Sequence, residues 1–183
     1  MSKSCVTENA LAASLKLLMK QNSINKISVK MVTDTCGVTR HTFYNHFHDI
    51  YELLGWIFEN EVIDEHCSLS NWKNGLFIAL QYTLDNKAIC INTYKSLGRE
   101  HLEIFLCKTF NKVLEGVITD MTPEMNVDEK IKKEVAVFFS SAITGEFLGW
   151  IKNGLKEEKE DIADRIERML DGTILRIMEV NNK

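Results

Sequence analysis

The sequence is poor in residues that interrupt helices, since its 183 residues include one proline and nine glycines. Proline removes a backbone donor and clashes with the preceding helical turn, so a chain with little proline can form long, unbroken helices. The sequence also has no internal repeat, no low-complexity tract and no clear alternating strand pattern. It therefore predicts an all-α fold.

Motifs that mark enzymes are also missing. The chain has no glycine-rich phosphate loop, nucleophile elbow, HExxH or CxxC motif, and no pair of carboxylates stands out from the polar helix faces. We therefore predict that the protein is not an enzyme and binds no cofactor. Its five cysteines are odd in number and widely spaced, which is typical of reduced thiols in the cytoplasm; they are Cys5, Cys36, Cys67, Cys90 and Cys107.

No stretch has the pattern of a secretion signal or a membrane span. Glu8 and Lys16 interrupt the apolar character of the N-terminal region. The most apolar run, residues 135–151, contains Glu146 and is shorter than the roughly 20 apolar residues that a spanning helix needs. We expect a cytoplasmic protein with no membrane partner, in which residues 135–151 form a buried helix.

The net charge of −4 is unevenly distributed along the chain. Residues 1–50 contain six Lys or Arg and three Asp or Glu, which gives +3 and leaves −7 for the remainder. His41, His46 and His48 lie in the same region and can gain positive charge beside phosphates. This asymmetry predicts a small DNA-binding domain on an acidic body. Because +3 is modest, we expect two such domains to act on one duplex.

Residues 28–54, SVKMVTDTCGVTRHTFYNHFHDIYELL, predict two short helices joined by a tight turn and followed by the start of a third. Ser28 can cap the first helix through its hydroxyl. Gly37 can end that helix, because glycine adopts the left-handed conformation at little cost. Asp49 and Glu52 have the spacing of a capping box, which predicts the start of the third helix.

The second of these helices, expected over residues 40–47, has an apolar side and a polar side. Phe43 and Phe47 are four residues apart and share the apolar side. The polar side carries side chains of several lengths that can reach phosphates and base edges in a major groove. The alternative is a solvated polar face without a partner. The candidate DNA-binding residues are Ser28, Lys30, Thr39, Arg40, His41, Thr42, Tyr44, Asn45 and His46.

The histidines of this stretch, with Cys36 nearby, raise the question of a metal site. His41 and His46 are five residues apart on one helix, about 140° from each other around its axis, so they cannot easily share an ion. We therefore predict no metal site.

The run VTRHTFYNHFHDIYELL, residues 38–54, resembles the signature of the TetR family of transcriptional regulators. The resemblance implies a three-helix DNA-binding domain followed by a helical body. Ile50 and His48 depart from the family pattern, which commonly has lysine and proline there, so the resemblance supports no phosphate contact at Ile50. It implies phosphate contacts by Thr39 and Thr42, phosphate or base contacts by Tyr44 and Asn45, and base contacts by Arg40 and Lys30.

Within that family, four segments resemble a low-GC Gram-positive subgroup that includes the dihydroxyacetone kinase operon activator. These segments are MSKS, TFYNHF, LLGWIFENE and FLGWIKNG. The likeness covers the N-terminal region well and the body loosely. Members of this subgroup rely on a protein coactivator instead of a small inducer, so the resemblance also implies that a body without a ligand pocket can be controlled.

The remaining helices are expected over residues 7–21, 49–65, 71–84, 87–97, 99–121, 128–153 and 159–179. The helix at 128–153 is apolar around much of its circumference, and the helix at 159–179 carries one apolar stripe. Two such helices from each of two chains can form a four-helix dimer interface. The alternative is a monomer with an unusually helical core.

Aromatic residues in the body, with a few polar neighbours, can line an effector site or simply fill the core. Our candidates for ligand contact are Tyr82, Tyr94, His101, Phe105 and Glu146.

Together these observations predict a helix-turn-helix DNA-binding domain at residues 1–48 and an effector-binding and dimerisation domain at 49–183. We expect a homodimer that places two recognition helices about 34 Å apart on a palindromic operator. A ligand or protein partner would tilt the connecting helix at 49–65, and repression is the expected sign of control. The alternatives are an activator that works with a protein coactivator, and a helical adaptor that binds protein instead of DNA.

Overall fold

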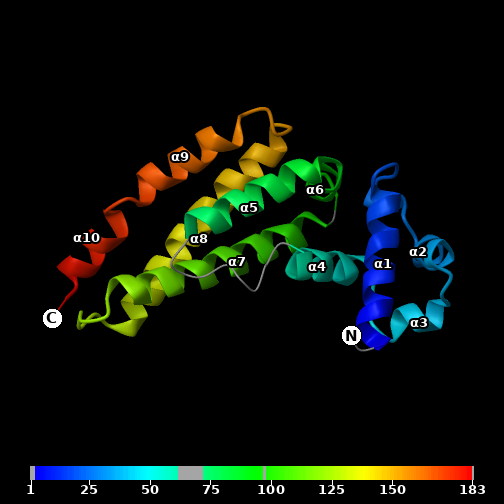
Figure 1. Ribbon diagram of the computed structural model, residues 1–183, viewed down its shortest axis with the longest axis horizontal. Coiled ribbons are helices and arrows are strands. Elements are labelled where there is room, and N and C mark those ends of the chain that lie inside the picture. Colours follow the sequence, from blue (N-terminus) through cyan, green and yellow to red (C-terminus); the bar gives the residue numbers. More distant parts are fainter. Residues whose placement is uncertain (1–2, 62–71, 97, 183) are drawn as a thin grey trace. The chain divides into compact units, whose positions relative to one another are not determined.

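The computed structural model describes residues 3–61, 72–96 and 98–182, and the regular elements within these ranges are all helical. The predicted all-α fold is therefore confirmed. The elements are α1 (Lys3–Met19), the 3-10 helix η1 (Ile24–Lys26), α2 (Val29–Cys36), α3 (Arg40–Tyr44), α4 (Ile50–Glu61), α5 (Trp72–Asp85), α6 (Lys87–Tyr94), α7 (Arg99–Met121), α8 (Glu129–Lys152), α9 (Lys159–Leu170) and α10 (Thr173–Val180) (Figure 1).

A few predicted features lie outside the described residues. They are the end of the connecting helix at 62–65, the helix start at Asn71 and the thiol of Cys67. The helix predicted at 87–97 ends earlier than expected, at Tyr94, and Lys95 is its C-cap. Cys36, Cys90 and Cys107 are free thiols, as predicted. Burial raises the pKa of the Cys90 thiol to about 12, which keeps it protonated at neutral pH.

The chain forms two compact units, one of residues 1–61 and 86–102 and one of residues 62–85 and 103–183. The first unit is larger than the predicted domain of residues 1–48, because it also contains α4 and α6. Both helices pack against α1, and Leu53 and Ile57 of α4 are fully buried. Sequence order therefore does not separate the two compact units.

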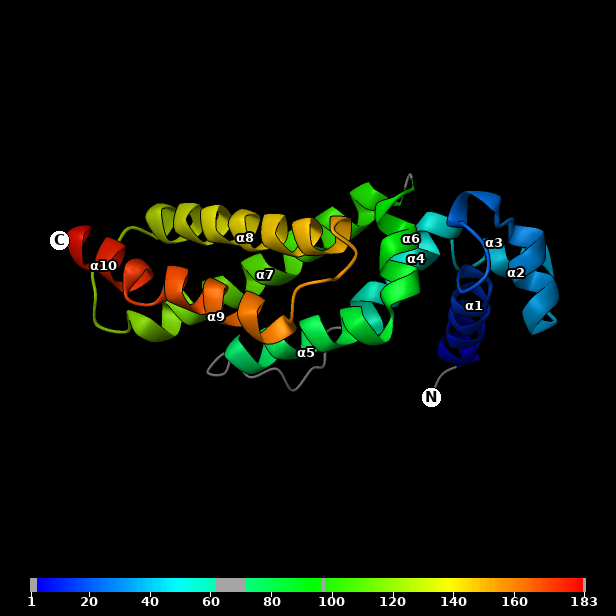
Figure 2. The same ribbon diagram turned by 90° about the horizontal axis from the view of Figure 1, so that it is seen from above.

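The first unit is built around α1, whose Leu11 and Leu15 are fully buried. In Figures 1 and 2, α2 and α3 lie on one side of α1, and α4 and α6 lie on the other. Val32 of α2 and Phe43 of α3 complete the core, and Ile27, between η1 and α2, is also buried. The recognition region is thus held by apolar contacts to a longer helix.

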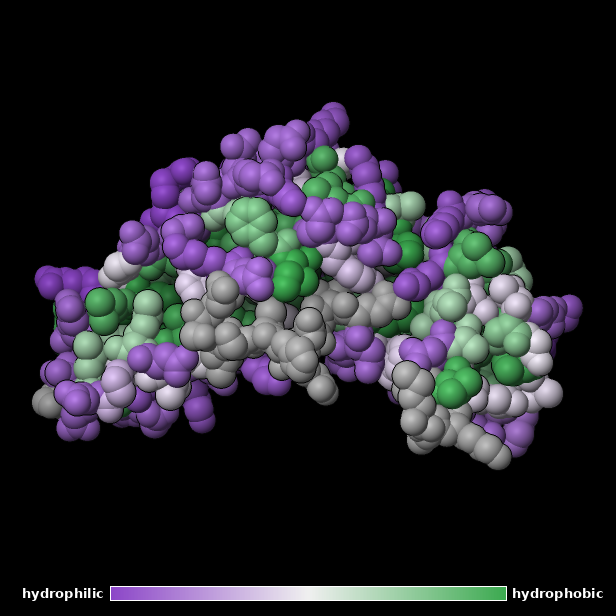
Figure 3. All heavy atoms as spheres, viewed as in Figure 1, coloured by the Kyte–Doolittle hydropathy of each residue, from purple (hydrophilic) through white to green (hydrophobic). Residues whose placement is uncertain are grey.

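The second unit contains α5, most of α7, and α8, α9 and α10 (Figure 2). Its core includes Phe110 and Phe147, whose ring centroids are 5.2 Å apart, and Ile166 of α9. Polar side chains dominate its upper edge, over α5 and α9, in the space-filling view (Figure 3). This division into an apolar interior and a polar exterior follows from the amphipathic stripes of its helices.

The predicted single helix at 159–179 is wrong. Gly172 has a φ of 68°, in the left-handed region, and it separates α9 from α10. Asp171 is already extended, with its amide donating to the carbonyl oxygen of Glu167. The apolar stripe continues across this break, which is why periodicity alone did not reveal it.

By length and composition, α8 is the one helix within the described ranges that could cross a membrane, and 44% of its most apolar window is buried inside the protein. Ile143, Phe147 and Ile151 of this helix are buried, which is typical of a core helix. Near its N-terminal half, Val137 and Phe138 are exposed. This helix is therefore covered on one side by the second unit and open on another.

Candidate nucleic-acid interface

The helix-turn-helix is formed by α2 and α3 with the capping interactions that the sequence predicts. The Ser28 hydroxyl oxygen accepts a hydrogen bond from the Met31 amide at 3.3 Å. Gly37 has a φ of 72° and ends α2 in the left-handed conformation. The Thr39 hydroxyl oxygen accepts from the Thr42 amide at 3.1 Å and caps α3. Both helix starts and the corner between them are therefore specified locally.

The recognition helix α3 ends at Tyr44, three residues earlier than predicted. Asn45 keeps a helical conformation, and the Phe47 amide donates to the carbonyl oxygen of Phe43 at 2.9 Å, so the turn continues without regular helix. Phe43 and Phe47 are buried, as the pattern predicted, and the ring of Phe47 also meets Trp56 of α4 edge to face. The apolar side of α3 is thereby fixed on the unit.

The start of α4 confirms half of the predicted capping box. One carboxylate oxygen of Asp49 accepts from the amides of Tyr51 and Glu52, at 2.8 and 2.9 Å. The Glu52 carboxylate, however, accepts from the amide of His48 instead of the Asp49 amide. These bonds fix the chain direction immediately after the recognition helix.

The outward side of α3 is polar and free of buried contacts. Arg40, His41 and Asn45 are exposed, and the Tyr44 side chain is 58% exposed. Thr42 is half-buried, and its hydroxyl lies 2.9 Å from that of Thr39. A large aromatic side chain that is exposed beside donors of different lengths can contact a phosphate or a base edge.

Two candidates sit differently from the rest. The Nδ1 atom of His46 lies 3.2 Å from a carboxylate oxygen of Glu8 on α1, and the His46 side chain is 17% exposed. His46 therefore faces α1 more than the solvent. Lys30 of α2 is exposed, and its ammonium lies 3.3 Å from Asp34 one turn later. A surface pair of this kind contributes about 0–1 kcal/mol, so a phosphate can readily replace the Asp34 carboxylate as the partner of Lys30.

The structure places the predicted ligand residues in separate environments. The Arg99 guanidinium lies 4.7 Å from the ring centroid of Tyr94, and His101 stacks on Tyr51 with centroids 5.7 Å apart. Glu146 is exposed and accepts a hydrogen bond from Arg165 at 2.9 Å, and Tyr82 is half-buried on α5. Glu146 also borders an open groove of about 330 Å³ between α8 and α9. The remaining candidate, Phe105, lines a smaller cavity.

That cavity lies within the second unit and has a volume of about 80 Å³. Thr109 contributes the hydroxyl Oγ1, which is buried and has no hydrogen-bond partner. Thr109 was not among the candidates, because a lone threonine on a helix gives no signal in sequence. The cavity is lined by Trp72, Gly75, Leu76, Ala79, Phe105, Leu106, Thr109, Phe110, Val113, Leu114, Ile143 and Ile166.

Residues 70–172 match a TetR-type family model described as "Transcriptional regulator C-terminal region". This match covers more than half of the chain. The chain belongs to the TetR family. The HTH-type dhaKLM operon transcriptional activator DhaS of Lactococcus lactis subsp. lactis (strain IL1403) is 36% identical over 123 residues, which cover 66% of this chain and 65% of that relative.

Several solved structures share the fold of this chain. A dihydroxyacetone kinase operon activator, DhaS, superposes with a TM-score of 0.73 at 25% identity, over 98% of this chain and 99% of that one. NalD, the secondary repressor of the MexAB-OprM efflux pump of Pseudomonas aeruginosa, gives 0.60 at 15% identity over 96% of both chains. RolR without ligand gives 0.57 at 16% identity, over 94% of this chain and 95% of that one.

Proposed function

We propose that this TetR-family protein is a homodimeric regulator that binds a palindromic DNA operator through α3. The observation that carries the proposal is the exposed polar face of α3, which is held in place from behind by Phe43 and Phe47. Arg40 can read base edges, and Tyr44 can contact a phosphate or a base. We assign DNA binding to the helix-turn-helix domain at residues 1–48, and control and dimerisation to residues 49–183. We place the protein in the cytoplasm.

Phosphates would be bound at the two helix starts. The hydroxyls of Thr39 and Thr42 lie 2.9 Å apart at the N-terminal end of α3, so one phosphate oxygen can approach both. Ser28 occupies the same position on α2, and Lys30 follows it within the first turn. Such contacts fix the register on the duplex, while the side chains farther along α3 reach the bases.

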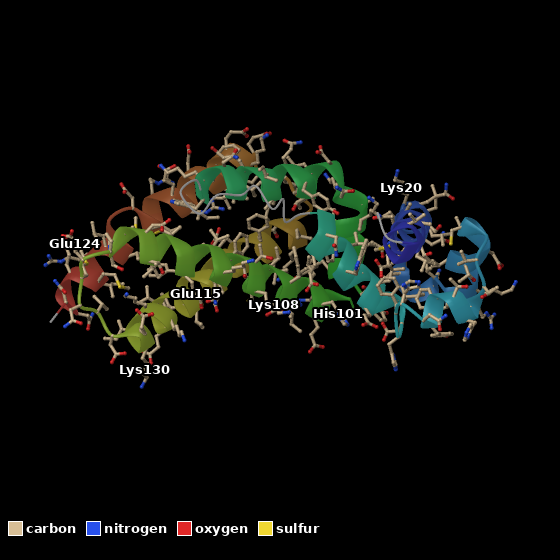
Figure 4. All side chains as sticks on the ribbon, turned by 60° about the horizontal axis from the view of Figure 1, so that its bottom comes forward. Lys20, His101, Lys108, Glu115, Glu124 and Lys130 are labelled. Carbon is tan, nitrogen blue, oxygen red and sulfur yellow. The ribbon has the colours of Figure 1, made fainter. Side chains whose placement is uncertain are left out.

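The dimer would form through α8 and α9. Phe138 is 70% exposed, and Met169 of α9 is also exposed. Farther along α8, Gly145 and Gly149 have nothing near a Cβ position, so a second helix can approach closely. Figure 4 shows Lys130 near the start of the same helix. An apolar surface of this kind, rimmed by charged residues, is typical of an interface between subunits.

A protein partner is supported as the controlling agent by the small enclosed cavity, which has about 80 Å³ against the roughly 300–1,000 Å³ of usual ligand sites. A more open groove of about 330 Å³, lined by Glu146 and Met169 among others, lies on the α8–α9 surface that we assign to the dimer. The Lactococcus relative is named an activator. Repression is the sign that the sequence suggested, and activation with a protein coactivator is the second candidate. A reporter fused to the promoter beside the gene distinguishes them, because deletion of a repressor raises expression and deletion of an activator lowers it.

DNA binding is tested by fluorescence anisotropy with fragments that flank the gene. We expect Arg40→Ala and Tyr44→Ala each to weaken binding by about tenfold or more. The wild-type affinity should fall steeply with salt, with a log–log slope of about 0.9 per phosphate contact. Leu17→Ala, at an exposed apolar side chain on α1, is the control and should leave the affinity unchanged. A homodimer that binds no fragment at low salt would favour the protein-binding adaptor.

A further inference from the structure

The segment between α1 and α2, residues 20–28, determines how the helix-turn-helix leaves α1; we call it the α1–α2 loop. Carbonyl groups at the C-terminal end of a helix lack partners within that helix and need them elsewhere. Here the end of α1 reaches Met19, and η1 begins at Ile24. Figure 4 labels Lys20, which marks this end of α1.

One side chain, the carboxamide of Asn92 on α6, binds the main chain at three points around this loop. Its Oδ1 accepts a hydrogen bond from the Ile24 amide at 3.0 Å. Its Nδ2 donates to the carbonyl oxygen of Met19 at 3.2 Å and to that of Asn22 at 2.6 Å. The two segments are 68 to 73 residues apart in sequence.

The chemistry of this contact is specific to a carboxamide. It needs one acceptor and two donors on the same planar group, and an aspartate of the same size has no donor at neutral pH. Ile24, whose amide donates to Asn92, is buried, so this amide cannot readily find a water molecule as an alternative partner. Removing the carboxamide would leave main-chain groups without partners, which costs more than the loss of an exposed hydrogen bond.

We propose that Asn92 is a positioning residue that transmits the position of α6 to the recognition helix. The inference rests on the proposed DNA-binding function. The chain runs from the α1–α2 loop into Ser28 and α2, and α2 contacts α3 directly. On its other side, α6 continues into α5 and α7. A movement of α6 would therefore displace the start of α2 through Asn92, without passing along the connecting helix α4.

A second contact of the loop provides a matched comparison. The Tyr51 hydroxyl of α4 donates to the side-chain oxygen of Asn25 at 3.1 Å, and this bond is exposed. It joins two side chains and leaves the main chain free. Tyr51→Phe removes one hydrogen bond to the same loop from the other helix, so it separates the role of Asn92 from a general loosening of the loop.

The first arm of the test needs no DNA. Amide hydrogen exchange is measured for the wild type, Asn92→Ala, Asn92→Asp and Tyr51→Phe. We expect exchange at Ile24 to rise about tenfold in Asn92→Ala and to stay at the wild-type rate in Tyr51→Phe. Asn92→Asp preserves the size of the side chain and the acceptor for the Ile24 amide but removes both donors, so it tests the contacts to Met19 and Asn22 in the second arm if the alanine variant folds poorly. Unchanged exchange at Ile24 in Asn92→Ala would overturn the proposal.

The second arm compares affinities for the operator and for a version with one base pair inserted between its half-sites. The affinity for the operator divided by the affinity for the inserted version reports how firmly the recognition helices are held in position. A loss of folded protein lowers both affinities equally and leaves this ratio unchanged. We expect the ratio to fall about fivefold or more in the Asn92 variants and to be unchanged in Tyr51→Phe. An unchanged ratio in the Asn92 variants would overturn the positioning role. Failure of the wild type to bind any fragment would instead overturn the proposed function, and the exchange arm would still decide on the Asn92 contact.

Discussion

The two compact units differ in what specifies their helices. In the first unit, the starts of α2, α3 and α4 and the end of α2 have local capping signals, such as Ser28, Gly37 and Thr39. In the second unit, α7 and α8 have 23 and 24 residues, and the apolar and polar sides of these helices specify their packing. The first unit can therefore present a polar face whose shape is set within the unit, while the second exposes large apolar side chains such as Val137 and Phe138 of α8.

Charge follows the same division. The first unit contains nine Lys or Arg and seven Asp or Glu, a net charge of +2, and the second contains thirteen and nineteen, a net charge of −6. An acidic second unit is repelled by the phosphate backbone, which favours contact through the first unit alone. The comparison teaches that the two units of one chain differ in net charge, and under the proposed function this difference would direct the first unit, and not the second, to DNA.

The largest expected effect is the loss of stability on removing a side chain from the core of the first unit. Phe43 is 0% exposed, so Phe43→Ala should lower the free energy of unfolding by about 3–5 kcal/mol. Urea denaturation followed by circular dichroism measures this change. The same substitution at Phe77, a partly exposed side chain on α5, is the control and should cost far less. Equal costs at both positions would contradict the assignment of Phe43 to the core.

The next effect concerns assembly through the second unit. Phe138→Asp places a charge on the exposed apolar surface of α8, so it should weaken the dimer by about tenfold or more in sedimentation velocity experiments. Ile104→Asp makes the same change at an exposed apolar residue of α7 and should leave the dimer intact. A dimer that is insensitive to Phe138→Asp would locate the interface elsewhere.

A smaller effect tests the local signals of the first unit. Gly37 has a φ of 72°, and an alanine in this left-handed conformation costs about 1–2 kcal/mol, so Gly37→Ala should destabilise the protein by that amount. Gly55→Ala is the matched control. Its position within α4 has open space for a Cβ, and the change should stabilise by up to about 1 kcal/mol. Urea denaturation of both variants should give changes of opposite sign.

The smallest effect is the pH dependence of a surface contact in the second unit. The hydrogen bond from Arg165 lowers the pKa of Glu157 below its ordinary value of 4.5. A carboxyl with a lowered folded-state pKa stabilises the fold above its unfolded pKa, and this contribution disappears as the pH falls through the folded value. Glu157→Gln should therefore slightly lower the melting temperature near neutral pH.

The same comparison at acidic pH provides the control for that experiment. Below the folded-state pKa both proteins carry an uncharged side chain at position 157, so their melting temperatures should converge. A difference between Glu157→Gln and the wild type that is equally large at neutral and acidic pH would contradict the role of the Arg165 contact.

Local sequence was sufficient where local bonds decide the structure. The caps at Ser28 and Thr39 and the corner at Gly37 each involve residues within five positions of one another, so their residue types predict them. Helix α7 likewise has the predicted bounds. The break at Gly172 had a local signal, the glycine itself, but the apolar stripe across it concealed its meaning.

The sequence predicted which residues form the candidate DNA interface, but it predicted less well which way their side chains face. The polar face of α3 follows from the spacing of Phe43 and Phe47. That His46 faces Glu8 on α1 depends on a pair of residues 38 positions apart, for which the sequence offers no signal. The cavity beside Thr109 likewise has no signal in the sequence, because its lining residues come from four helices that only the folded chain brings together.

By itself, the sequence of this protein determined its helical class, the corner between α2 and α3, and the division into a basic N-terminal region and an acidic remainder. The tertiary structure alone decided that α6 belongs to the first unit and that Asn92 binds the end of α1. The physical reason is range. Capping and periodicity act over one or two helical turns, whereas a contact between residues about 70 positions apart exists only after the chain has folded and brought both to one place.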